Sequence, residues 1–422
     1  MLTEGRCGVM RKMNYALGAL LLVITLGCRD LGTPPDTQQG QSRPLLSTEQ
    51  ALVASDNAFG FKLFQSINRD ETGKSVFISP VSVSMALGMT LNGANGTTRD
   101  AMAQTLEFGG MSQYDINSSY KSLIALLMGL DPKVKFQIAN SIWYRPDLNV
   151  EQSFKDVNKE NFGAEINSID FSDPSAAKTI NGWVDRNTNG KITEIVPDPI
   201  PRDLVMYLIN AIYFKGTWTY RFDSSQTRDD FFILADGSRK PCRMMSQGGK
   251  FSYYSDDQLQ AIDMTYGDAG FSTTFLLPKV GTNIETFANQ LTQQQWNTWI
   301  GRMDSTKGDI FLPKFKLEYK KKLNDMLTAM GMSIAFDPNT ADFRNIDRRG
   351  NLFISEVMHK TFVQVDEEGT EAAAVTSVGI SRSSIGPSDN FIMRVDRPFI
   401  VVIREHHSGT ILFIGKVVEP TL

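Results

Sequence analysis

The residue types that most often carry enzyme chemistry are sparse in this 422-residue chain. It has three histidines, His359, His406 and His407, and no G-x-S-x-G, H-E-x-x-H or G-x-G-x-x-G sequence. Those motifs position a nucleophilic serine, a zinc ion and a dinucleotide pyrophosphate, respectively. No carboxylate or cysteine cluster accompanies His406 and His407, so we expect solvated side chains there and no metal site. We therefore predict a protein that is not an enzyme and needs no cofactor, and a hydrolase is the distant alternative.

The N-terminus has the pattern of an export signal. Arg11 and Lys12 precede a short apolar run at residues 16–26, which ends at Gly27 and Cys28. A basic segment, an apolar segment too short to span a bilayer and a small residue before the cut are typical of a signal peptide. We assign residues 1–27 to it, and residues 28–46, rich in Gly, Pro, Gln and Thr, to a flexible tether.

The end of this signal resembles a bacterial lipobox, which implies that Cys28 is lipidated. Thr25 departs from that motif, which usually has leucine there. We expect an exported protein that is lipid-anchored to the bacterial cell envelope or outer surface, and a plain signal peptide with secretion is the alternative. Cys7 is then removed with the signal and Cys28 carries lipid, which leaves Cys242 alone. No disulfide can form within the mature chain.

Charge and composition exclude other classes of partner. The net charge is −4, and the run Lys320-Lys321-Lys322 is too short to indicate a nucleic-acid site. With 41% hydrophobic and 21% charged residues, the chain is typical of a folded protein. We expect no contact with nucleic acid, and contact with a membrane only through the N-terminal lipid.

From Ser47 onward the pattern predicts one α+β domain, residues 47–422. Helical segments come in blocks, and no Pro/Gly-rich linker interrupts them. The strand-like runs are Phe136–Trp143, Met206–Phe214, Phe271–Leu277, Phe353–Val365, Pro398–Arg404 and Thr410–Val418.

The segment EEGTEAAAVTSVGISRSSIGP, residues 367–387, does not fit a helix, a tight loop or a stable strand. In an extended conformation one face would carry Thr370, Ala372, Ala374, Thr376, Val378 and Ile380, all of them uncharged. Such a segment is able to enter a sheet, although its Ala and Gly residues are poor strand formers. Gly369, which is free to adopt positive φ, stands where it would pivot.

At this segment the chain resembles the serpins, a family of protease inhibitors. EEGTEAAA is similar to the serpin hinge, and the motifs FISPVSVSMALGM, NAIYFKGTW, HKTFVQVDEEGTEAAA and RVDRPFIVVIRE…GTILFIGKVVEP follow the order of the family. The resemblance spans Ser47 to Pro420. It implies three β-sheets, eight or nine helices and an exposed reactive-centre loop at about residues 367–390.

The resemblance also implies a mechanism and assigns residues to it. In an inhibitory serpin, a protease cuts the loop and forms an acyl-enzyme, and the freed segment then inserts into the main sheet and traps the protease. The hinge is Glu367, Glu368, Gly369, Thr370, Glu371, Ala372, Ala373 and Ala374. A polar cluster under the sheet, the shutter, matches Ser79, Ser82, Asn210 and His359. The breach, where the loop first enters, matches Trp218, Lys314 and Glu367.

The implied partner is a serine endopeptidase, with cysteine endopeptidases as a further class, held in a covalent complex by a monomeric inhibitor. No basic helix near residues 115–130 matches the glycosaminoglycan site of some serpins, so we expect no such activator. The long basic side chain favours Arg382-Ser383 as the reactive bond and trypsin-like targets, whereas counting from Gly369 favours Ser383-Ser384. A non-inhibitory serpin acting as carrier or chaperone is the nearer alternative function. The uncharged inserting face and the absence of proline before Pro387 argue against it.

Overall fold

The computed structural model describes residues 43–370 and 390–421, which belong to one compact unit. The proposed signal peptide and Cys28 lie outside these residues, as does nearly all of the tether. No helix among the described residues is long and apolar enough to cross a membrane.

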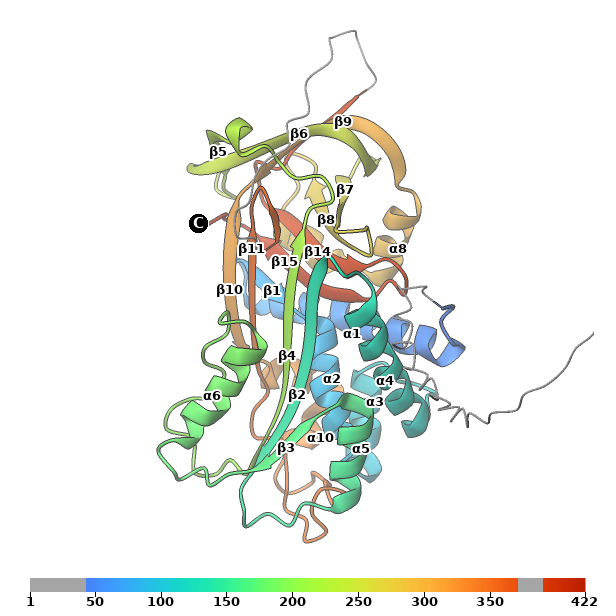
Figure 1. Cartoon of the computed structure of the whole chain (residues 1–422), viewed down its shortest axis with the longest axis vertical. Coiled ribbons are helices and arrows are strands. Elements are labelled where there is room, and N and C mark those ends of the chain that lie inside the picture. The colour runs from blue at the N-terminus through green and yellow to red at the C-terminus, as the bar shows by residue number, and fades with distance from the viewer. Residues whose placement is uncertain (1–42, 371–389, 422) are drawn as a thin grey trace, which may run out of the picture. The chain divides into compact units, whose positions relative to one another are not determined.

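A six-stranded sheet runs along the length of the described unit and contains the residues before and at Thr370 (Figure 1). Its strand order is β10 (Phe315–Lys322), β11 (Met358–Val365), β12 (Gly369–Thr370), β4 (Met206–Thr217), β2 (Val134–Tyr144) and β3 (Glu165–Ser168). β12 is antiparallel to both of its neighbours. β4 and β11 therefore run in the same direction, toward the end of the sheet where β12 lies.

The remaining strands form a second, nine-stranded sheet. Its order is β1 (Val76–Ile78), β15 (Ile411–Val417), β14 (Phe399–Glu405), β8 (Phe271–Pro278), β7 (Leu259–Tyr266), β6 (Arg239–Ser255), β9 (Asp304–Pro313) and β13 (Phe391–Arg394), with β5 (Arg228–Ile233) paired to β6. Ladder hydrogen bonds thus give two sheets where the resemblance implied three. The reason is the 17-residue β6, which pairs with β5 and β9 along most of its length and with β7 at its end.

The described helices pack around these sheets. They are α1 (Ser47–Asp70), α2 (Pro80–Leu91), α3 (Gly96–Thr105), α4 (Gln113–Gly129), α5 (Gln152–Phe162), α6 (Ala176–Asn187), α7 (Ile284–Gln290), α8 (Gln293–Gly301), α9 (Asn324–Leu327) and α10 (Ser333–Phe336). α9 and α10 are two parts of one helical stretch interrupted at Gly331, where φ is +116°. Counted as one, they bring the described helices to nine, in agreement with the expected number.

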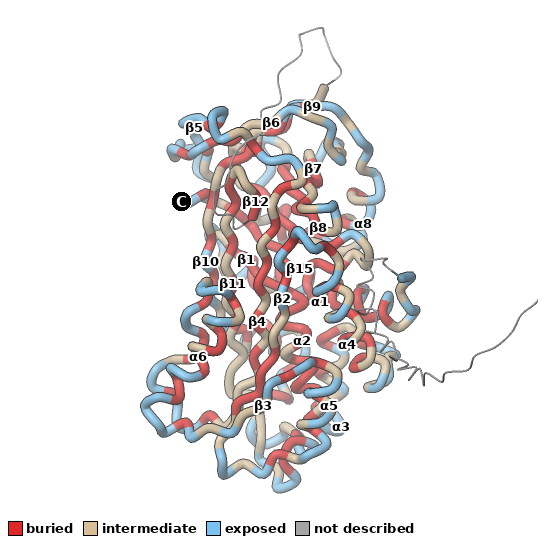
Figure 2. Tube along the Cα trace, viewed as in Figure 1, coloured by how far each residue is buried: buried red, intermediate tan, exposed pale blue. Residues whose placement is uncertain are grey.

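α2 is the helix that matters most for the site, because it lies in the core beneath the six-stranded sheet. Its sequence PVSVSMALGMTL is apolar or small on every side, and all of its residues except Ala86 are buried. Figure 2 shows the buried positions running along the strands and this helix. On the opposite face of the sheet, α6 packs Ile180, Trp183 and Val184 against β2 and β4 in a second, smaller core. β4 is thus covered on both faces, by α2 and by α6.

Candidate functional site

The hinge already occupies one end of the six-stranded sheet. Gly369 and Thr370 pair with Thr217 and Gly216 of β4, and Thr370 also pairs with Val365 of β11. Thr370 is buried, and its hydroxyl hydrogen-bonds to that of Tyr266. The sequence placed Thr370 first on the uncharged face, which implies that it would be the first residue buried on insertion. The structure shows instead that it is buried before any insertion.

Gly369 is required at its position by both space and backbone conformation. Its φ is +156°, and a Cβ atom there would lie 2.0 Å from the carbonyl oxygen of Gly216. No side chain fits such a close approach to β4. Gly369, which was predicted as a pivot, therefore also allows the hinge backbone to pair between β4 and β11.

The breach residues hold this inserted end in place. The Lys314 ammonium lies 2.6 Å from Oε2 of Glu367, and the Thr227 hydroxyl donates to Oε1 of the same carboxylate at 2.8 Å. Burial alone would raise the pKa of Glu367, but these hydrogen bonds outweigh it and hold that pKa below its usual value. Glu367 is thus ionised and paired at the base of the loop, which agrees with the predicted Lys314–Glu367 pair.

Trp218 holds the turn between β11 and β12 against the end of β4. Its backbone N–H donates to the carbonyl of Glu368 at 2.9 Å, and its indole N–H donates to the carbonyl of Asp366 at 2.9 Å. The indole stacks on Tyr266 with ring centroids 4.4 Å apart. Arg221 adds a pair to Glu368 at 2.6 Å. The turn from β11 into β12 is therefore fixed by main-chain and side-chain contacts together.

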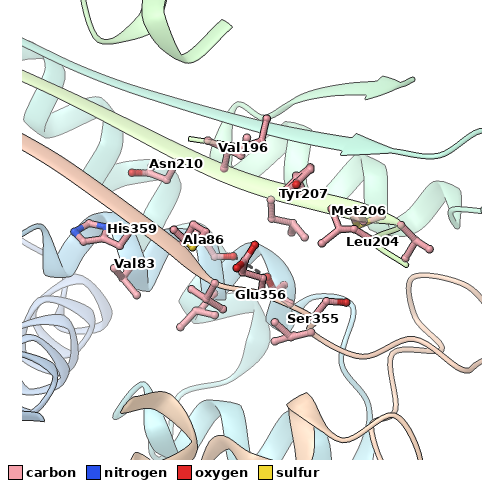
Figure 3. A pocket seen from close by; sticks show the side chains of 18 of the residues that line it. Val83, Ala86, Val196, Leu204, Met206, Tyr207, Asn210, Ser355, Glu356 and His359 are labelled. Carbon is pink, nitrogen blue, oxygen red and sulfur yellow. Dashed lines mark hydrogen bonds between the residues drawn. The ribbon is translucent and has the colours of Figure 1, made fainter. Parts of the chain in front are cut away.

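Below β12 the sheet is open. Within the described residues, β4 and β11 each pair with β12 but not with one another. A cavity of about 120 Å³ separates the first half of β4 from residues 352–359, with α2 as its floor (Figure 3). The sequence predicted a strand from Phe353 to Val365, but β11 begins at Met358. Residues 353–357 are apolar enough for a strand and have no partner strand on the cavity side.

The shutter residues meet at the upper end of this cavity. The backbone N–H of Ser79 donates to Nε2 of His359 at 3.0 Å, and the Asn210 amide donates to Oδ1 of Asn140 at 2.8 Å. The Ser82 hydroxyl reaches the Asn210 carbonyl at 3.5 Å. All four predicted residues also line a smaller cavity of about 10 Å³. The structure thus brings together residues from α2, β4 and β11, as the resemblance implied.

His359 is neutral in this setting. It is 5% exposed, and burial lowers the pKa of its imidazole to about 4. Because Nε2 accepts the Ser79 N–H, a proton on Nε2 would cost that hydrogen bond. Two polar atoms beside it, the Ser79 hydroxyl and Oδ1 of Asn210, are buried without a hydrogen-bond partner among the described residues. Buried polar atoms without a hydrogen bond destabilise the folded state. A polar group inserted between the strands would supply the missing hydrogen bonds.

One cluster combines the residue types of a hydrolase but not the geometry. Nε2 of His406 lies 2.7 Å from the Ser272 hydroxyl and 3.0 Å from Oδ2 of Asp263. A catalytic triad needs serine and carboxylate on opposite ring nitrogens, whereas both share one here. Ser272 is also fully buried, and Arg404 pairs with Asp263 at 3.1 Å. His406 was expected to be solvated, and its side chain is only 31% exposed because of these contacts.

Some predicted residues lie outside the described part of the chain. These are the hinge residues Glu371, Ala372, Ala373 and Ala374, and the candidate reactive-bond residues Arg382, Ser383 and Ser384. Among the described residues, no group of three or more His, Cys, Asp or Glu side chains is arranged to hold a metal ion. Cys242 is free, as the sequence indicated; the structure shows that it is also buried, and burial raises the pKa of its thiol.

Sequence reasoning missed several residues of the site. Tyr266, Thr227 and Asn140 contact the hinge, the breach carboxylate and the shutter amide, respectively. None of them lies near its partner in the sequence. Tyr266 ends β7, whose sequence LQAIDMTY largely alternates apolar and polar residues, a pattern that is typical of a strand.

The fold and the arrangement of hinge, breach and shutter define a class, and comparisons with known proteins agree. Residues 54–420 match the family described as "Serpin (serine protease inhibitor)". The chain belongs to the serpin family.

Relatives and solved structures cover the same region. The chain is 34% identical over 379 residues to the leukocyte elastase inhibitor of Xenopus laevis, covering 87% of this chain and 99% of the relative. The human leukocyte elastase inhibitor is 32% identical over 382 residues, covering 88% of this chain and all of the relative. The thermophilic serpin tengpin in its native state superposes with a TM-score of 0.81 at 32% identity, over 89% of this chain and 95% of tengpin. Human thyroxine-binding globulin in complex with thyroxine superposes with a TM-score of 0.80 at 29% identity, over 89% of this chain and all of that protein.

Proposed function

We propose that this serpin inhibits serine endopeptidases, with cysteine endopeptidases as a second target class, by trapping them on its cleaved reactive loop. One observation carries the proposal: the hinge is already paired between β4 and β11, directly above a gap in the sheet. The chain itself continues from Thr370 at the mouth of this gap.

The chemical step belongs to the protease. Its serine hydroxyl attacks the carbonyl carbon of Arg382, the bond to the Ser383 nitrogen breaks, and Ser383 becomes a new N-terminus. Arg382 is left as an acyl ester on the protease. The freed N-terminal part of the loop then inserts, before water hydrolyses that ester.

The register of β12 indicates where the inserted strand would lie. Thr370 stands opposite Gly216 and Val365, so six residues later Thr376 would stand opposite Asn210 and His359. Thr376 shares the face of Thr370, whose side chain points into the core. A hydroxyl would thus arrive beside the unpaired Ser79 and Asn210 oxygens of the shutter.

The energetics favour an irreversible step. The 13 residues from Thr370 to Arg382 would carry the tethered protease roughly 40 Å in an extended strand. Ladder bonds to both neighbours, at ~1 kcal/mol net each, add on the order of 10 kcal/mol. Because β4 and β11 run in the same direction, both new ladders would be antiparallel.

A protease panel tests this function. Incubation with trypsin-like, elastase-like and papain-like enzymes should give a complex with a trypsin-like enzyme that survives denaturing electrophoresis, and the released peptide should begin at Ser383. Arg382→Ala should abolish that complex, whereas Arg348→Ala, at a side chain 83% exposed, should not. A peptide that begins at Ser384 would move the reactive bond by one residue. Cleavage without any covalent complex would instead support a non-inhibitory serpin.

The target preference follows from Arg382 and not from the relatives. The relatives are named as inhibitors of elastase, whose pocket is small, whereas Arg382 pairs with the carboxylate of a trypsin-like pocket. Thyroxine-binding globulin, solved in complex with thyroxine, shows that this fold also binds a small molecule. The uncharged inserting face of residues 370–380 favours inhibition here.

We also propose that the mature protein is anchored through lipid on Cys28 at the bacterial envelope, and that residues 29–46 act as a tether. The apolar run before Cys28 and the small residue at Gly27 support this. Cys28→Ala should release the protein from the membrane fraction, and mass spectrometry of the mature N-terminus should show the lipid. An unmodified N-terminus at another residue would contradict the anchor and leave secretion.

A further inference from the structure

The cavity below the hinge is large enough to bind a small molecule. Its volume is about 120 Å³, and it extends from the shutter to the start of β4. A dry engineered cavity of about 150 Å³ in another protein binds benzene. By that comparison the space suits a molecule with one aromatic ring, or an indole at most.

The walls of the cavity are mostly apolar. Val83 and Leu87 of α2 form the floor, Leu208 of β4 forms one side, and Leu352 and Ile354 form the other. Figure 3 shows how these elements surround the space. Such a lining favours an aromatic or aliphatic ligand over a polar one.

Two polar groups in the lining lack partners. The Tyr207 hydroxyl and Oδ1 of Asn210 are buried with no hydrogen-bond partner among the described residues. The ring centroids of Tyr207 and Phe171 lie 5.6 Å apart, and burial raises the pKa of the Tyr207 phenol so that it stays neutral. A ligand with one hydroxyl or N–H group would satisfy one of these atoms.

The charge at the rim selects against ions. Glu356 lines the cavity and lies 3.5 Å from Lys322, its ion-pair partner. A second carboxylate there would be repelled and desolvated, and a cation would have to displace Lys322. A neutral ligand meets neither cost.

We propose that this cavity binds a neutral aromatic molecule of phenol to indole size that carries one hydrogen-bonding group. The cavity occupies the space that an inserted loop would need, so the ligand should compete with insertion. This second statement rests on the proposed inhibitory function, whereas binding itself does not.

Calorimetry and ligand-observed NMR on the intact protein test the binding. Phenol and indole should bind saturably at one site, and benzoate and benzylamine at least about tenfold more weakly. Ala86→Leu, which adds bulk to the α2 floor, should abolish binding, whereas Ala51→Leu on the exposed face of α1 should not. Tyr207→Phe should weaken the binding of phenol by up to about tenfold and leave the binding of toluene unchanged.

Each outcome decides one part of the proposal. No saturable binding of phenol or indole to the intact protein would overturn the site, and so would binding that persists unchanged in folded Ala86→Leu protein. If Ala86→Leu protein does not fold, Tyr207→Phe still tests the site: equal effects of this substitution on phenol and toluene binding would overturn it. Loop-cleaved protein whose melting shows insertion should lose phenol binding. Retained binding there would overturn the competition but not the inhibitory function, which the protease panel tests separately.

Discussion

The two ends of the same sheet differ sharply in how their polar groups are satisfied. At the breach, Glu367 has an ammonium and a hydroxyl as partners, and Trp218 donates hydrogen bonds to the carbonyls of Asp366 and Glu368. At the shutter and below it, the Ser79 hydroxyl, Oδ1 of Asn210 and the Tyr207 hydroxyl have no partner among the described residues. One end is complete, and the other has room for a strand.

This difference indicates where the proposed metastability would lie. The breach has the hydrogen bonding of a finished sheet, because two residues of the loop are already in it. The lower part has unpaired strand edges on β4 and on residues 353–357, and such edges are unfavourable when they are covered on both faces. Insertion would therefore proceed from the complete end toward the incomplete one.

Cleavage of the loop should have the largest effect on this comparison. A cut between about Ser381 and Ile385 frees the segment to fill the gap, so the thermal midpoint should rise by tens of degrees. Differential scanning calorimetry of nicked and intact protein measures this. Coincident melting of the two forms would mean that the lower sheet does not accept the loop.

A charge on the inserting face should abolish inhibition without damaging the intact fold. Because Thr370 is already buried, Thr370→Arg would disturb the breach itself and is a poor test. Ala372 lies outside the described residues and is predicted to be on the same face as Thr370. Ala372→Arg would bury an unpaired charge on insertion, at a cost of several kcal/mol. We expect it to turn the inhibitor into a substrate.

Ala373→Arg is the matched control, because its side chain should point to the other face. It should retain most of the covalent complex on denaturing gels. If both variants form the complex equally, the assigned register is wrong. If neither variant forms the complex, insertion excludes a charge on either face of the segment.

The shutter should make stability depend on pH through His359. Its pKa falls from 6.5 to about 4 on folding, so the folded state binds its proton more weakly than the unfolded state. This contribution is complete above pH 6.5 and is lost as the pH falls toward 4, by about 3 kcal/mol in total. Urea unfolding of wild type and His359→Gln across this range should show the wild type losing its advantage at low pH.

The comparison with His359→Gln is needed because Asp56 acts in the opposite direction. Burial raises the pKa of Asp56 to about 7, against hydrogen bonds from Ser84 and Tyr120 that lower it. That contribution is present below pH 3.8 and is lost as the pH rises through 7. It is common to both proteins, so it cancels in the difference. A difference that does not change with pH would show that His359 is not buried as a neutral group.

The smallest effect should come from the breach ion pair. Lys314→Met leaves Glu367 with Thr227 as its remaining side-chain partner and should cost about 1–2 kcal/mol in urea unfolding, since the pair is largely buried. Lys316→Met, two residues further along the chain in β10, breaks the Lys316–Glu318 pair, whose side chains are about half exposed, and should cost less than about 0.5 kcal/mol. Equal costs would show that the breach pair is no stronger than a surface pair.

Local patterns in the sequence predicted most of the strands of the site. The runs at Phe136–Trp143 and Met206–Phe214 lie within β2 and β4, because their β-branched and aromatic residues alternate across a buried sheet. The hinge, breach and shutter positions followed from resemblance to a family, and the structure brings those of them that it describes together. No local pattern connects Ser79 to His359, which are 280 residues apart.

The sequence by itself determined the α+β class, the uncharged inserting face and the glycine at the pivot, since these depend on residue type and on a period of two along the chain. Only the tertiary structure decided that Thr370 is already buried and that residues 353–357 lack a partner strand. Both depend on the separation of β4 and β11, which come from distant parts of the chain. α2 and α6 pack against the two faces of β4 beside this gap, and no pattern within one segment records contacts between such distant parts of the chain.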